Sequence, residues 1–313
     1  MKITKSQLRH IILESINEEK NNMKSFFSLN ECVIATKVFG KDRVLIKNRD
    51  RNYKPKLEIV REIVDGMEIV YMHDLDTDWS EGMNEKGIGI INSALAVSDD
   101  ERDKKMAKSG KKSFDGAKIR KALSMKTLRD AVKSVLTFEG ESDPEKSPLK
   151  SKTGKPTALN GHTIVASSKS AFHVESTSDK TPVVVKLNKK GFVETNHGDE
   201  ISEVGYTEKS HPKDFKSSVS REKIAKKIMT SAKTPEEALE DLSKKQKGVK
   251  GYLNPYRYDY KFFTGSQIML NLDKKEFTLA IDPEVCDFKG IIDKTPKNHK
   301  EKIKIIVIDR SDK

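Results

Sequence analysis

Cysteine is nearly absent from this 313-residue sequence, which contains only Cys32 and Cys286. Two cysteines do not make a disulfide framework, so the sequence favours a reducing compartment such as the cytoplasm. Long apolar runs are also missing, and no stretch approaches the roughly 20 residues that a membrane-spanning helix requires. The first residues lack the continuous apolar core of a secretory signal. These absences argue against a disulfide-stabilised secreted protein and against a membrane protein.

Charge, in contrast, is abundant. Lysine and arginine together number 60 against 48 acidic residues, which gives a net charge of +12. A positive balance attracts polyanions such as nucleic acid. The lysines are spread over the whole chain, so we interpret them chiefly as a solvated surface and keep non-specific DNA contact as the alternative. The segment 251–263 (GYLNPYRYDYKFF) could stack bases, although such a segment more often packs on its domain as a loop.

The segment from Glu31 to Asp50 predicts a β-hairpin. Apolar and β-branched residues fill positions 33–39 and 43–47, and a Gly-Lys-Asp turn separates them. If the turn centres on Lys41, Cys32 pairs with Asp50, and a thiol and a carboxylate lie side by side at the open end of two strands. The alternative is that Cys32 is a small buried hydrophobe on an ordinary strand.

The first 31 residues predict a helical leader ahead of one domain over residues 32–313. Thr4 and Gln7 form a capping-box pattern at the start of an amphipathic helix over residues 4–20. A polar stretch then separates this helix from the first strand. In form this is a detachable leader, and the alternative is a helix that stays packed on the domain.

The remaining pattern predicts strands, a helix, strands, two helices and closing strands. The expected strands cover residues 57–64, 67–73, 87–97, 162–167, 171–175, 182–187, 191–195, 267–272, 277–281 and 303–308. The expected helices cover residues 124–136 and 218–230, with a third that begins after the N-cap Thr234. Residues 79–86 are interpreted as a polar connector, and residues 98–116 and 139–156 as polar insertions. This order indicates the α+β class, with antiparallel sheets stacked between helical layers.

Five motifs occur in a fixed order along the chain. They are Cys32, KNRD ending at Asp50, SEGMNEKGIGIINSAL with Asn92, ETNH with Asn196, and SSVSR ending at Arg221. This order resembles the N-terminal-nucleophile (Ntn) hydrolases of the choloylglycine hydrolase, penicillin V acylase and acyl-CoA:6-aminopenicillanate acyltransferase group. The resemblance covers residues 32–230 by motif. It implies a four-layer αββα sandwich that cleaves linear amides, with no cofactor.

The resemblance assigns a role to each motif. It implies that Cys32 is the nucleophile and that Asp50 lies near its sulfur and amine. Asn196 matches an oxyanion-hole donor, Arg221 matches an arginine near the nucleophile, and Asn92 matches a second oxyanion or substrate-positioning asparagine. Serine-rich sequence before Arg221 is expected to form a turn. The implied substrate is a small N-acyl amide, with hydrolysis or acyl transfer as the reaction.

This chemistry requires a free α-amine at Cys32. A cysteine thiol with a pKa of about 8.5 needs a nearby base, and the α-amine of the same residue, with a pKa of about 8, can serve. An amide nitrogen cannot accept the proton, so the bond between Glu31 and Cys32 must first be cut. As written, the chain is therefore expected to be an inactive precursor.

The chain departs from the family at Lys47, where bile-salt-cleaving members have an arginine. Lysine keeps the charge but lacks the bidentate fork, which puts bile-salt cleavage in doubt. We nevertheless expect Lys47 and Arg49 to contribute to substrate binding. Relatives are often dimers or tetramers, which leaves a homo-oligomer open.

Two routes of processing are open. Leu29-Asn30-Glu31 resembles the apolar-x-Glu sites that head-maturation proteases of large tailed phages cut, so a protease could remove the leader. Alternatively, the Cys32 thiol attacks the Glu31 carbonyl in an autocatalytic reaction. A phage origin suggests a second function class, a basic head protein of the virion interior that keeps the fold without catalysis and associates with DNA.

Other chemistries find little support in the sequence. His73, His162, His173 and His197 lack metal-ligand spacing, and there are no paired cysteines, so we expect no metal site. A papain-like couple of Cys32 and His197 lacks the helix-borne cysteine of that class.

Overall fold

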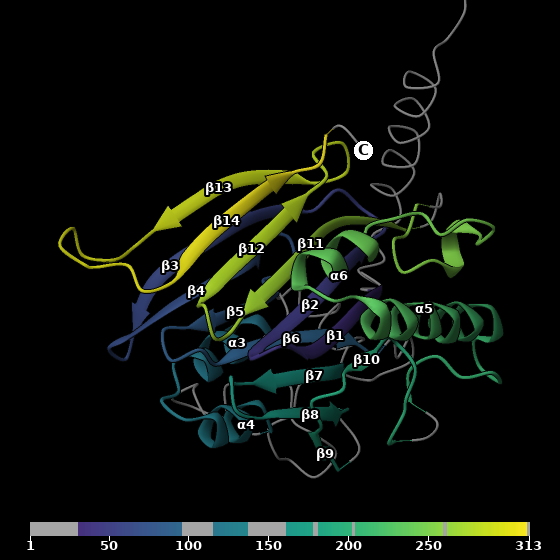
Figure 1. Cartoon of the computed structure of the whole chain (residues 1–313), viewed down its shortest axis with the longest axis horizontal. Helices are drawn as coiled ribbons and strands as arrows, with labels where there is room; N and C mark the ends of the chain where they lie inside the picture. The colour runs from purple at the N-terminus through teal and green to yellow at the C-terminus, as the bar shows by residue number, and fades with distance from the viewer. Residues whose placement is uncertain are drawn as a thin grey trace, which may run out of the picture.

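The computed structural model describes residues 31–95, 115–136, 161–177, 181–201, 204–258 and 262–311. The leader expected over residues 1–31 lies outside the described residues except for Glu31. Most of the predicted insertion 98–116 and the whole of the insertion 139–156 also lie outside them. Within the described residues the strands form two sheets, of six and eight strands (Figure 1).

The first sheet contains the predicted hairpin at its centre. In spatial order its strands are β10 (Phe192–Glu194), β1 (Glu31–Phe39), β2 (Asp42–Arg51), β11 (Phe263–Asn271), β12 (Glu276–Ile281) and β14 (Lys304–Asp309). All neighbours pair antiparallel except β12 and β14, which pair parallel. The start of β1 is thus flanked by β2 on one side and by the chain leaving β10 on the other.

The second sheet contains eight strands. In spatial order its strands are β13 (Asp287–Asp293), β3 (Lys56–Val64), β4 (Met67–Asp74), β5 (Ser80–Asn84), β6 (Gly89–Ala94), β7 (Gly161–Ala166), β8 (Ala171–Ser176) and β9 (Val183–Leu187). Its one parallel pairing in the described residues joins β13 to β3. The sheets are therefore mixed rather than purely antiparallel, because the chain crosses from β12 to the second sheet and back to β14.

Helices cover the outer face of each sheet (Figure 1). The helical segments are α3 (Asp115–Leu123), α4 (Leu128–Leu136), α5 (Pro212–Ser231), α6 (Pro235–Asp241) and the 3₁₀ turn η1 (Gly251–Leu253). One apolar cluster joins α5 and α6 to the first sheet, a second joins α3 and α4 to the other sheet, and a third lies between the sheets. This is the four-layer αββα sandwich that was expected.

Strand β1 shows how the sequence produces the layers. Val33 and Ala35 pack in the helix-facing cluster, whereas Ile34 packs in the cluster between the sheets. Side chains alternate between the two faces of a strand, so a strand that is covered on both faces reads as a continuous apolar run. Cys32 therefore lies on the inner face, and Glu31 lies on the face toward α5.

Three predicted elements were wrong in extent or type. The polar connector at residues 79–86 contains the central strand β5, whose polar side chains have buried partners; Asn84, for example, donates to the carbonyl oxygen of Leu123 at 2.8 Å. Helix α3 begins within the predicted insertion. Helix α5 begins at Pro212, so the serine-rich sequence before Arg221 is helical and not a turn.

The helix signal at Thr234 is confirmed. Thr234 has extended backbone angles and its side chain accepts from the Glu237 nitrogen, with Pro235 as the first helical residue. This local cap needs no tertiary information, which is why the sequence predicts it well. Among the helices of the described residues, none combines the length and apolar character needed to cross a bilayer.

Candidate active site

Cys32 is the second residue of β1 and is 1% exposed. It pairs with Arg49 in the structure, so the predicted pairing of Cys32 with Asp50 was wrong. The turn contains Gly40 and Lys41 alone, because Phe39 already pairs with Asp42. Gly40 has a φ of 61°, a conformation that a two-residue hairpin turn favours for glycine. The prediction assumed a longer turn, which shifts the register by one residue.

The corrected register places Asp50 opposite Glu31. Residues that pair directly across a ladder point to the same face, so both carboxylates face helix α5. Cys32 and Arg49 face the second sheet instead. On that inner side the Arg51 guanidinium donates to the Cys32 sulfur at 3.7 Å.

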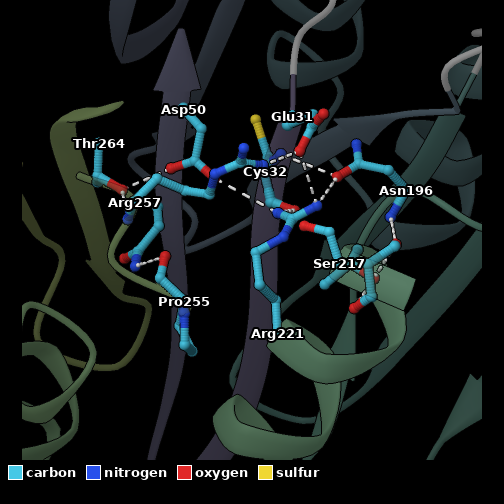
Figure 2. A network of polar contacts seen from close by, with 12 residues as sticks. Glu31, Cys32, Asp50, Asn196, Ser217, Arg221, Pro255, Arg257 and Thr264 are labelled. Atoms are coloured by element: carbon cyan, nitrogen blue, oxygen red, sulfur yellow. Dashed lines mark hydrogen bonds and ion pairs between the residues drawn. The ribbon is translucent and has the colours of Figure 1, made fainter. Parts of the chain in front are cut away.

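Arg221, on helix α5, joins the predicted residues to one another (Figure 2). One guanidinium nitrogen donates to the Cys32 carbonyl oxygen at 3.3 Å and to the Asp50 carboxylate at 3.4 Å. The other donates to the side-chain oxygen of Asn196 at 3.0 Å. That same Asn196 oxygen accepts from the Cys32 backbone nitrogen at 3.1 Å. Cys32, Asp50, Asn196 and Arg221 are thus brought together from β1, β2, the end of β10 and α5.

Asp50 is fully buried, and its environment shifts the pKa of its carboxyl group. Burial raises the pKa of Asp50 to about 7. The guanidiniums of Arg221 and Arg257 oppose this rise, as does the Thr264 hydroxyl, which donates to the carboxylate at 2.6 Å. The neighbouring Glu31 carboxylate pushes the pKa upward.

A second set of charges lies on the inner side of the hairpin. Arg49 donates to Glu81 at 2.8 Å and to Asp74 at 2.8 Å, and Lys47 contacts Glu81. Burial alone would raise the pKa of Glu81, but Arg49 and Lys47 hold it below its usual value. These ion pairs connect β2 to β4 and β5 across the space between the sheets. Lys47 and Arg49, expected to bind substrate, are at most 1% exposed and already paired.

Lys47 is coupled electrostatically to the candidate nucleophile. Burial lowers the pKa of Lys47, and a negative charge on Cys32 raises it again. Arg49 and Arg51 balance Asp74 and Glu81, so a protonated Lys47 is an additional cation on this side.

Asn92 is not joined to Cys32 by any hydrogen bond within the described residues. Its side-chain oxygen accepts from Lys47 at 3.2 Å and from the Trp79 indole. The neighbouring Ser93 lies beside Cys32 instead, with its hydroxyl 3.5 Å from the Cys32 carbonyl oxygen. Ser93 also accepts from the Asn196 side-chain nitrogen at 3.0 Å.

Sequence reasoning missed two residues around Glu31. The Tyr206 hydroxyl donates to the Glu31 carboxylate at 3.0 Å, and Arg257 forms an ion pair with it. Arg257 lies in the aromatic and basic segment that was interpreted as a loop packed on the domain. No motif marks either residue, because their role arises from contacts with a residue about 175 or more positions away.

Three residues elsewhere could hold a metal ion. The candidate ligand atoms of His162, His173 and Glu175 lie within 4.8 Å of one another, although their spacing gave no such signal. These groups already have partners, since the two rings are joined at 2.9 Å and Glu175 accepts from backbone nitrogens of residues 199–201. Burial lowers the pKa of His162 to about 4 and of His173 to about 3, so both rings are neutral at pH 7.

His197 pairs with Glu222 at 2.9 Å and contacts the Ser218 hydroxyl at 2.8 Å. Among the described residues no contact joins His197 to Cys32. The geometry therefore gives no support to the papain-like couple.

Comparison with known proteins finds likenesses among solved structures. No protein-family model matches the sequence, and no curated protein matches it. Among solved structures, the chain is similar to penicillin V acylase from Agrobacterium tumefaciens, with a TM-score of 0.42 and 12% identity over 80% of this chain and 86% of that chain. At this level the likeness assigns neither a family nor an activity to this chain.

Proposed function

We propose that this chain is the precursor of a cysteine Ntn hydrolase that cleaves a linear amide through an acyl-thioester on Cys32. The observation that carries the proposal is the position of Arg221. One buried guanidinium contacts the Cys32 carbonyl, the Asp50 carboxylate and the Asn196 side chain. These are the residue types that the reaction requires, and they come from distant parts of the chain.

The first step makes the base. Cutting the bond between Glu31 and Cys32 converts the Cys32 amide nitrogen into an amine that can accept a proton. The thiol then gives its proton to this amine, and the sulfur attacks the amide carbonyl of the substrate. Collapse of the tetrahedral intermediate breaks the C–N bond, and the ammonium protonates the leaving amine. Water, or another amine, then releases the acyl group from sulfur.

We assign to Asp50 the role of stabilising the ammonium that forms on the Cys32 amine. In the uncut chain, burial and the Glu31 carboxylate hold the pKa of Asp50 at about 7. Removal of Glu31 takes away a negative neighbour, and the new ammonium adds a positive one. Both changes lower the pKa of Asp50, so a charged carboxylate can orient the ammonium and stabilise it.

We assign to Asn196 the role of donating a hydrogen bond to the oxyanion of the tetrahedral intermediate. Its side-chain nitrogen donates to the Ala94 carbonyl oxygen at 2.6 Å in the uncut chain. A substrate oxyanion would replace that carbonyl as the acceptor. A single such donor accelerates acyl transfer by roughly 10²–10³.

The two processing routes differ in their reactants. In autocleavage the Cys32 sulfur attacks the Glu31 carbonyl, the C–N bond breaks to free the Cys32 amine, and water then releases the leader from the thioester. In the other route a maturation protease cuts after Leu29-Asn30-Glu31. Refolded precursor incubated alone separates them, because only autocleavage releases the leader without an added protease. A Cys32→Ala precursor is the control.

A panel of N-acyl anilides tests the function itself. We expect the processed chain to release aniline from at least one member, and Cys32→Ala to release none. An intermediate whose mass increases by one acyl group should accumulate on Cys32 when an activated amide is used. Salt-sensitive DNA binding without turnover of any member would instead favour the DNA-associated protein, which no contact described here supports.

A further inference from the structure

Glu31 occupies a built carboxylate pocket. Its side chain is on the face toward α5 and is 1% exposed. Arg221 donates to the carboxylate at 3.1 Å, Tyr206 donates at 3.0 Å, and Arg257 forms an ion pair with it. Figure 2 shows the Glu31 carboxylate beside Cys32, with the Arg221 and Arg257 side chains reaching toward it.

Processing changes the charge of this pocket. When Glu31 leaves with the leader, Arg221 and Arg257 lose the carboxylate that they share. The cleavage also adds an amine at Cys32 next to the same side chains. Asp50 still pairs with Arg221 at 3.4 Å and acts on Arg257, but one carboxylate cannot balance two guanidiniums and an ammonium, so the processed site should attract a second anion.

The Glu31 side chain also indicates where the acyl part of a substrate would lie relative to Cys32. In the scissile peptide bond, Glu31 is the acyl part and Cys32 supplies the nitrogen. Its side chain therefore lies where the acyl chain of a substrate would lie when the same carbonyl position is occupied. Three carbon atoms separate the Glu31 carbonyl from its carboxylate, which is the spacing of a glutaryl group.

We propose that the vacated pocket of Arg221, Arg257 and Tyr206 binds a carboxylate on the acyl part of the substrate, with N-glutaryl amides as the substrate class. This inference rests on the proposed function. The sulfur of Cys32 bonds to the near carbonyl of the glutaryl group while the C–N bond breaks and the amine leaves with a proton. Water then releases glutarate and restores the thiol. In the precursor, Glu31 holds this pocket and excludes the substrate.

A binding experiment on the full chain tests the pocket without catalysis. In a Cys32→Ala background, which keeps the chain uncut, Glu31→Ala removes the occupying carboxylate. We expect acetate to raise the Tm of the double variant by several degrees at matched ionic strength, and neutral acetamide to leave it unchanged. The Cys32→Ala protein, whose pocket is full, should not respond. Equal Tm shifts in the two proteins, or equal Tm shifts with acetate and with acetamide, would contradict the proposal that this pocket binds a carboxylate.

A kinetic experiment on the processed enzyme tests the substrate class. We expect kcat/KM for glutaryl-4-nitroanilide to exceed that for pentanoyl-4-nitroanilide by about ten- to a hundredfold, the range of a hydrogen bond to a charged group. Arg257→Gln should bring the ratio of the two kcat/KM values close to one, and Tyr206→Phe should reduce this ratio by less. Turnover of both anilides without preference would contradict the proposed carboxylate subsite but not the proposed amidase function. Turnover of neither contradicts the function and the subsite together.

Discussion

The backbone nitrogen of Cys32 donates to the side-chain oxygen of Asn196 at 3.1 Å. In the uncut chain this nitrogen is an amide donor with no basic lone pair. The same nitrogen would be the base of the processed enzyme, so the structure already holds it against a side chain that can orient it. Arg221 donates to the same oxygen and fixes the Asn196 side chain in place.

Replacing Asn196 tests the oxyanion assignment. We expect Asn196→Ala in the processed enzyme to lower kcat by roughly 10²–10³ with little change in KM, because an oxyanion donor acts in the transition state. Steady-state kinetics on a chromogenic anilide measures this. Thermal unfolding of the same variant is the control for its structural contacts. A folded variant with nearly full kcat would contradict the assignment.

Asp50 predicts a pH dependence of stability in the uncut chain. Its folded-state pKa of about 7 lies above the usual value for an unfolded aspartate, so the folded protein binds more protons between these values. Asp50 should therefore contribute a fall of up to about 4 kcal/mol to the unfolding free energy as pH rises from about 4 to about 7. Over part of this range the lowered pKa values of His162 and His173 contribute a rise, so the effect of Asp50 is measured as a difference between the parent and a variant. Asp50→Asn should remove the contribution of Asp50, so the slope of the unfolding free energy against pH in this range should become more positive than in the parent. Denaturant titrations at several pH values measure it, and an unchanged slope would contradict the assigned pKa.

Glu194 predicts a further decline at higher pH. Its carboxylate is fully buried, neither oxygen has a hydrogen-bond partner in the described part of the chain, and burial raises its pKa to about 9. Glu194 should make the unfolding free energy fall from pH 7 to pH 9, where Asp50 no longer contributes. Glu194→Gln should remove this slope, whatever it does to stability at pH 7. His162 and His173 act only at acidic pH, so they do not interfere with the measurement.

The buried ion pairs between the sheets predict a large stability effect. Glu81→Gln leaves Lys47 and Arg49 without the carboxylate that both contact, and we expect a loss of about 3–5 kcal/mol in denaturant unfolding. Asp241→Asn is the matched control. It removes an exposed pair with Lys244 and should cost far less, because solvent screens the charges. Similar losses in both variants would contradict this account of the network.

The sequence predicted local features of the fold better than the site that the fold assembles. The cap at Thr234 and the hairpin after Glu31 depend on neighbouring residues, and both are present. The hairpin register was wrong by one residue because it depends on turn length, which Gly-Lys-Asp does not decide. Strand β5 was missed because its polar residues are buried only through partners on β2 and near α3.

The site shows the same division. Cys32, Asp50, Asn196 and Arg221 were selected through a resemblance of ordered motifs, and they lie together in the structure. Arg257 and Tyr206 were not selected, because no local pattern distinguishes an arginine or tyrosine that a distant glutamate will contact. Asn92 was placed one residue away from Ser93, which makes the contact with Cys32.

The mass of the active chain tests the central claim most directly. Intact-mass spectrometry should be combined with turnover of an N-acyl anilide by the same purified sample. We predict that activity belongs to a chain that begins at Cys32, and that the chain retaining Glu31 is inactive. Full activity in a protein whose bond between Glu31 and Cys32 is intact would contradict the mechanism.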